Sequence, residues 1–236
     1  AKAAGMRVVI TDHHLPGAQL PAADAIVNPN QIGDDFPSKC LAGVGVVFYV
    51  MIALRAVLRE QGWFKGLAQG ESNLASLLDL VALGTIADVV PLDHCNRILV
   101  AQGLARIRRG QCCPGILAML DIAGRDRQRL SASDLAFAVA PRLNAAGRLD
   151  DMSLGISCLL SDDYVQARGI AARLELLNVE RREIEAGMRE EAVRQAEVHG
   201  AVDTEGSSAR GLCVYDPAWH QGVIGILAGR LKERFH

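Results

Sequence analysis

Three titratable side chains in a row are the sharpest chemical feature of the sequence. Asp12, His13 and His14 follow, after Thr11, residues 6–10, a short apolar run rich in β-branched residues that predicts a buried parallel strand. Ligands bind beyond the carboxyl ends of the strands in an open parallel sheet. Because neutral imidazole and carboxylate groups suit ions such as Mn, Fe and Zn, this position predicts a metal site.

The two imidazoles of this cluster are expected to differ in role. Adjacent side chains of an extended backbone point to opposite sides, so His13 and His14 would face different surroundings. Asp12 has two possible roles, because a carboxylate can bind a metal itself or hold the tautomer of an imidazole ring. A pair of histidines alone is weak evidence, so the metal site needs support from other residues.

A further carboxylate stands alone in an apolar run. Asp88 lies within residues 84–92 and follows Gly84-Thr85, a pair that predicts an interruption of the preceding helix. An ionised carboxylate in apolar surroundings needs a metal, an arginine or several N–H donors. The structural alternative is an aspartate that caps a helix N-terminus or closes a turn.

Residues 140–148 have the composition of a phosphate-binding segment. Arg142, Asn144 and Arg148 lie among small residues, which would let a phosphate backbone approach closely. The alternative interpretation is an exposed loop between two helices.

Residues 219–225 are a second candidate anion-binding segment. His220 and Gly222 belong to a polar turn that opens a glycine-punctuated helix, and the N-terminus of such a helix can bind an anion. A capped helix with a packed tryptophan is the equal alternative.

The elements that must position these residues follow an α/β order. Helices are expected at 40–61, 74–83, 96–109 and 115–122, after strands at 6–10 and 25–27. Ser131 and Asp134 have the spacing of a capping box that opens a further helix. A strand-turn-strand unit followed by helices is typical of the latter part of an α/β domain with a parallel sheet.

The pattern changes after residue 161. Apolar residues at helical spacing predict one long helix over 162–199, which we interpret as a solvated connection between domains rather than a partner-binding coiled coil. Residues 200–211 have the composition of a linker, and a strand at 212–215 and a helix at 222–235 would begin a second domain. Both ends look cut through structure, which predicts a piece of a longer polypeptide.

Composition limits the classes of function. The 236 residues carry a net charge of −2 and are 50% hydrophobic, as in a globular protein with a sizeable core. This balance excludes binding of nucleic acid by bulk positive charge, and the 4% of aromatic residues makes base stacking an unlikely main device. Residues 97–148 nevertheless hold nine arginines against three aspartates, and arginine suits bidentate phosphate contacts.

Cysteine usage and hydropathy bear on the compartment. Six cysteines without regular spacing predict free thiols in a cytoplasmic protein rather than a disulfide framework. Residues 41–58 are the most apolar run, but Gly43, Gly45 and Arg55 favour a buried helix over a membrane span.

A set of ordered motifs resembles one known superfamily over nearly the whole chain. The motifs are VVITDHHLPG, AIVNPN, FPSKCLAGVGVVFY, LLDLVALGTIADVVPL, NRIL, APRLNAAGRLDD and WHQGVIGILAGRLKERFH. Together they resemble the DHH phosphoesterases, and within them the single-strand-specific 5′→3′ DNA exonucleases. The resemblance implies the C-terminal part of a parallel-sheet DHH domain over 1–161, a connector helix over 162–200, a linker over 201–211 and the start of a DHHA1-type domain over 212–236.

The resemblance also implies an activity and its site. The activity is metal-dependent hydrolysis of single-stranded DNA that releases 5′-mononucleotides, with Mn²⁺ or Mg²⁺ in a two-metal centre and with single-strand-binding protein and a helicase as further partners. By motif position, His13 and Asp88 would bind metal, and Asp12 and His14 would be catalytic. Nucleic acid would contact Arg142, Asn144 and Arg148 in the arginine-rich segment. In the second domain, His220 and Gly222 would lie on the substrate side.

Two alternatives remain, and one departure from the pattern limits the site. A related DHH phosphoesterase could act on short oligonucleotides or cyclic dinucleotides, and an inactive DHH-like protein could be a structural subunit of a replication assembly.

The upstream Asp-x-Asp-x-Asp-Gly motif and the later glycine-rich and OB-fold regions of the family are missing. We therefore expect this chain to hold only part of the metal-binding set.

Overall fold

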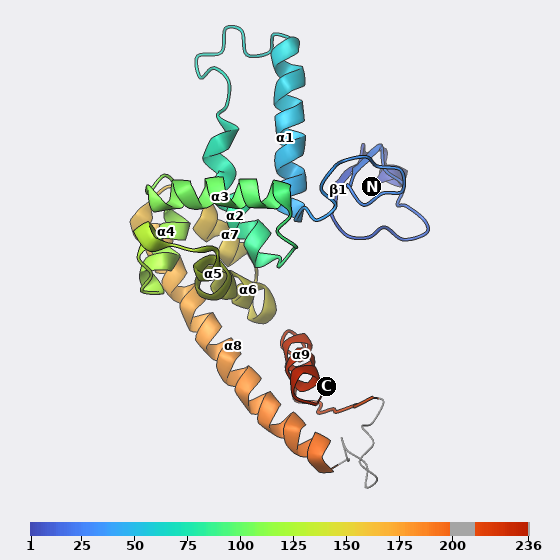
Figure 1. The fold of residues 1–236 in the computed structure, drawn as a ribbon, viewed down its shortest axis with the longest axis vertical. Coiled ribbons are helices and arrows are strands. Elements are labelled where there is room, and N and C mark those ends of the chain that lie inside the picture. Colours follow the sequence, from blue (N-terminus) through green and yellow to red (C-terminus); the bar gives the residue numbers. More distant parts are fainter. Residues whose placement is uncertain (199–210, 236) are drawn as a thin grey trace.

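The computed structural model describes residues 1–198 and 211–235 (Figure 1). After a short 3-10 turn, Lys2–Ala4, two strands pair in parallel: β1, Val9–Thr11, and β2, Ala25–Val27, with Val9 opposite Ala25. The predicted parallel strands are therefore confirmed, although β1 begins three residues later than expected. Its predicted burial is wrong: Val9 is 66% exposed, because the sheet described here has two strands and no layer over both faces.

Two helices follow this sheet, and the first of them packs against it. The first, α1, spans Gly43–Glu60, and α2 spans Leu78–Ala87 after a 3-10 turn at Leu74–Leu77. Gly84 was expected to break α2, and this prediction is wrong, because the helix continues through it to Ala87. A Cβ atom on Gly84 would lie 2.7 Å from Cγ1 of Val44, so the glycine allows α1 to pack closely on α2.

A compact group of helices follows. It comprises α3, His94–Arg108; α4, Pro114–Ile122; a 3-10 turn, Arg127–Arg129; α5, Ala132–Asp134; a π-helical turn η4, Leu135–Val139; α6, Ala140–Leu149; and α7, Ser153–Leu160. The capping box is confirmed, since the side chains of Ser131 and Asp134 each accept the other's backbone N–H. The segment 140–148 is helical, so the loop alternative is wrong. Side chains such as Ile107, Met119 and Leu135 are fully buried and form the core of this group.

The long helix expected after residue 161 is observed as α8, Tyr164–Val198, and α9, Ile224–Phe235, packs beside its distal half (Figure 1). The end of the connector at 199–200 and linker residues 201–210 lie outside the described residues. The strand expected at 212–215 is absent from the described segment: the backbone of Tyr215 instead exchanges two hydrogen bonds with the side-chain amide of Gln195 on α8. Among residues 1–198 and 211–235 we find no helix long and apolar enough to cross a membrane.

Candidate metal and phosphate site

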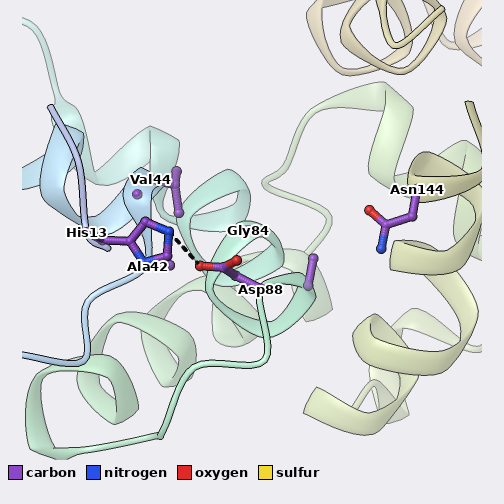
Figure 2. Close-up of a pocket in the computed structure, with 8 residues that line it drawn as sticks. His13, Ala42, Val44, Gly84, Asp88 and Asn144 are labelled. Atoms are coloured by element: carbon purple, nitrogen blue, oxygen red, sulfur yellow. Dashed lines mark ion pairs between the residues drawn. The ribbon is translucent and has the colours of Figure 1, made fainter. Parts of the chain in front are cut away.

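The structure brings together two predicted metal-binding side chains that are 75 residues apart in sequence. Nε2 of His13, just beyond β1, lies 3.4 Å from Oδ2 of Asp88, the residue that follows α2 (Figure 2). Asp88 is the C-cap of that helix rather than an N-cap. The His13 ring is 18% exposed and the Asp88 side chain 40%, so both remain open to a ligand.

Asp12 organises the backbone of the histidine pair. Its Oδ1 accepts hydrogen bonds from the backbone N–H of His13 at 2.7 Å, the backbone N–H of His14 at 3.2 Å and Nδ1 of His14 at 2.8 Å. These bonds, led by the one from His14, hold the pKa of Asp12 below its usual value. Asp12 is therefore ionised at neutral pH, and Nδ1 of His14 carries the proton of their shared bond.

The two rings do not diverge as the extended-backbone argument predicted. Their centroids lie 4.2 Å apart, because the turn that Asp12 closes curves the chain directly after β1. Their surroundings still differ: His13 is largely covered and faces Asp88, whereas the side chain of His14 is 75% exposed.

Two asparagines of the motif AIVNPN, which were not predicted as site residues, fix this cluster. Nδ2 of Asn30 donates to the carbonyl oxygen of His13 at 2.7 Å, and Nδ2 of Asn28 donates to that of His14 at 2.8 Å. Oδ1 of Asn28 also accepts the backbone N–H of Asn30 at 2.9 Å. Asn28 is 3% exposed, so its amide is committed to these bonds. The available signal was the placement of both amides just beyond β2, at the same sheet edge as the histidines.

A pocket of about 350 Å³ surrounds the His13–Asp88 pair. Its walls are Gly43 and neighbouring residues at the start of α1, the C-terminal end of α2, and Asn144 on α6. Asn144 lies across the pocket from Asp88 (Figure 2). The imidazole of His13 lies against the start of α1, since a Cβ on Gly43 would be in van der Waals contact with its Cδ2 at 3.5 Å.

Arg142 faces away from solvent. Its Nε lies 2.6 Å from Oε2 of Glu175 on α8, its Nη1 donates to the carbonyl oxygen of Ala138, and its side chain is only 11% exposed. Burial lowers the pKa of its guanidinium, and the positive charge of Arg182 adds to this effect. The geometry makes Arg142 a link between α6 and α8.

The remaining predicted residues form a second group at the C-terminal end of α6. Nη1 of Arg148 donates to the carbonyl oxygen of Gly222 at 3.0 Å, and Nδ1 of His220 accepts the backbone N–H of Gly222 at 3.1 Å. A Cβ on Gly222 would lie 2.2 Å from the carbonyl oxygen of Arg148, so only glycine fits. The structure does not bring His220 or Gly222 into the pocket of His13.

The donor set fits part of a divalent metal site. One imidazole nitrogen and one carboxylate oxygen converge on an open pocket, and this combination of ligands suits Mn²⁺. Within residues 1–198 and 211–235 no group of three or more His, Cys, Asp or Glu side chains is placed to hold a metal.

The fold and this site define a class of protein. Residues 1–85 match the N-terminal domain of the DHH family. Over nearly its whole length the chain is similar to RecJ proteins. It is 62% identical over 233 residues to the single-stranded-DNA-specific exonuclease RecJ of Dickeya dadantii, and 59% identical over 237 residues to that of Escherichia coli.

Solved structures agree with this assignment. A crystal structure of exonuclease RecJ bound to manganese matches 98% of the chain with a TM-score of 0.79 and 35% identity, and the chain covers 53% of it. RecJ from Thermus thermophilus in complex with Mn²⁺ gives the same TM-score at 34% identity, with 31% of that chain covered. The chain spans about 40% of the length of the curated relatives it matches: 98% of it aligns with 40% of the Dickeya protein, and all of it with 41% of the Escherichia protein. The predicted α/β class and family are therefore confirmed.

Proposed function

We propose that the protein containing this chain is a metal-dependent exonuclease that degrades single-stranded DNA from its 5′ end and releases 5′-mononucleotides. The observation that carries the proposal is the convergence of His13 and Asp88 in one pocket, in a chain whose relatives are named for this activity. A related structure bound to manganese and another bound to magnesium support these two ions as cofactors.

Each site residue then has a role that its contacts support. His13 and Asp88 bind the ion, which when bound polarises a phosphodiester and lowers the pKa of a water. Asp12 orients His14, whose exposed ring faces the substrate side. Asn144 contacts a phosphate across the pocket, and Arg142 positions its helix.

The second group of residues sets where the strand leaves the pocket. Arg148 has further N–H donors beyond the one given to Gly222, and these can contact a phosphate that passes along α6. His220 and Gly222 hold this end of α6 against the turn before α9. Contacts to phosphate carry no sequence information, so cleavage is independent of base sequence.

The domain organisation is part of the same proposal. We assign residues 1–161 to the DHH domain, 162–200 to the connector, 201–211 to the linker and 212–236 to the start of a DHHA1-type domain. Six free thiols fit a reducing cytoplasm. A nuclease that needs single strands would act beside a helicase that opens the duplex or a protein that coats single strands.

The proposed function is tested by measuring how fast the full-length protein hydrolyses different substrates. With Mn²⁺ present, we expect mononucleotides to be released from the 5′ end of long single strands, with little attack on blunt duplex. Faster hydrolysis of dinucleotides or cyclic dinucleotides would instead favour an oligonucleotide-directed DHH phosphoesterase. No hydrolysis of any substrate would favour the inactive structural subunit.

A further inference from the structure

An exposed aromatic ring stands on the helical segment that forms one wall of the site. Phe137 lies in η4 and is 80% exposed, more than any other aromatic side chain of residues 1–198 and 211–235. The turn that carries it is rigid, because Leu135 and Val139 on either side are fully buried in the core. A π-helical turn inside a helix is itself rare and often marks a functional position.

Phe137 is followed along the same helical segment by two residues of the proposed site. Asn144 and Arg148 are also exposed, whereas the side chains between Phe137 and Arg148 are mostly buried. Asn144 and Arg148 are four residues apart, about one helical turn, and so share a face of α6, and Phe137 is exposed on the π-helical turn that leads directly into this helix. We call these three exposed side chains, which follow one another along the helical segment, the ridge. At about 1.5 Å per residue, Phe137 lies roughly 10 Å along the helix from Asn144.

We propose that Phe137 stacks on an unpaired base of the DNA strand whose phosphates run along this ridge into the pocket. The inference rests on the proposed function and adds a base-binding residue to it. Every base has a π-face, so such stacking tolerates any sequence. A base inside a duplex is already stacked and paired, so contact with Phe137 would favour single strands.

The position of the ring predicts which base it contacts. At about 3.4 Å per stacked nucleotide, 10 Å corresponds to roughly three nucleotides from the phosphate at Asn144. Arg148, at the C-terminal end of this segment, is exposed and adds a positive charge that can contact a phosphate. The ridge therefore combines a ring for a base with polar groups for the phosphates.

The test uses the full-length protein and oligonucleotides in which one abasic site is moved stepwise from the 5′ end. In the wild type, we expect KM to rise when the abasic site is roughly three nucleotides from the cleaved bond. Phe137→Ala should raise KM for intact strands roughly 5- to 100-fold with little change in kcat, and should abolish the dependence on abasic position. Phe137→Trp should restore both properties. Trp63→Ala, which removes an exposed ring just after the C-terminal end of α1, is the matched control and should change neither.

The outcomes separate this inference from the proposed function. If the wild type cleaves single strands and Phe137→Ala has the same KM and abasic profile, the inference fails while the function stands. If Phe137→Ala has a lower Tm or an altered oligomeric state but an unchanged abasic profile, Phe137 contacts protein rather than a base. This result would also overturn the inference. A wild type without activity on single strands would reject the proposed function and, with it, this inference.

Discussion

At the scale of single residues, the histidine pair is held by its backbone as much as by its side chains. Asp12 closes the turn from one side, and the amides of Asn28 and Asn30 bind the carbonyl oxygens of both histidines from the other. These contacts therefore fix the direction of the His13 imidazole towards Asp88. Such supporting contacts affect metal affinity because they hold the ligand in place.

Asn30→Ala in the full-length protein tests this support. The change removes donors to the carbonyl oxygens of His13 and Lys39, and we expect Mn²⁺ to bind about 10-fold more weakly in a calorimetric titration. Asn73→Ala is a matched control, because it removes the cap of a 3-10 turn that contributes no residue to the pocket. It should lower stability by about 1 kcal/mol and leave Mn²⁺ affinity unchanged. Equal effects of both variants on Mn²⁺ affinity would contradict the role of Asn30.

The sequence alone was sufficient for part of this site. Asp12 and His13 could be placed because residues at the end of a parallel strand share the binding edge of a sheet. The roles of Asn28 and Asn30 could not, because asparagine beside proline is also typical of a plain turn. A single sequence does not distinguish an amide that closes its own turn from one that reaches back 14 or 17 residues.

At the scale of elements, the close contact between α1 and α2 sets the separation of the two proposed metal-binding side chains. His13 lies against Gly43 at the start of α1, and Asp88 follows α2. Gly84 brings Val44 close to α2. From sequence this glycine predicts a helix break, because glycine disfavours helix interiors. The tertiary contact that requires it cannot be inferred from the sequence.

Gly84→Ala should therefore push α1 away from α2. We expect a loss of about 1–3 kcal/mol in the free energy of unfolding, and weaker Mn²⁺ binding because Asp88 and His13 move apart. Gly169→Ala in α8 is the matched control: no atom lies within 4 Å of its new Cβ, so it should stabilise by about 0.4–1 kcal/mol. Denaturant unfolding measures the stability of both variants. A Gly84→Ala protein as stable as the wild type would contradict the close packing of α1 on α2.

At the scale of the whole molecule, α8 joins two separate clusters of buried side chains. The larger cluster lies among α2–α8, and the smaller one joins α8 to α9 through residues such as Met188, Val223 and Leu227. The bond from Arg148 to Gly222 connects α6 to this smaller cluster directly. Helical periodicity was enough to predict α8 and α9. The pairing of Tyr215 with Gln195 was not predictable, because it replaces a strand with a side-chain contact.

Gly222→Ala should loosen the contact between α6 and the turn before α9. A new Cβ would meet backbone atoms of Arg148, which cannot rotate away, so we expect amide exchange in α9 to accelerate about 10-fold or more, with slow exchange kept in α4. Gly225→Ala, with open space around its Cβ, should leave exchange in α9 unchanged or slower. If amide exchange in α9 is as slow in Gly222→Ala as in the wild type, α6 and the turn before α9 accommodate the new Cβ without separating, which would contradict this prediction.

The central claim is that His13 and Asp88 bind the same divalent ion, and a double-mutant cycle of Mn²⁺ affinity in the full-length protein tests it most directly. We predict that His13→Ala and Asp88→Asn each weaken binding at least about 10-fold with folding preserved, and that the double variant binds scarcely more weakly than either single one. Affinities close to the wild type in either single variant, or effects of the two changes that simply add, would contradict a shared ion.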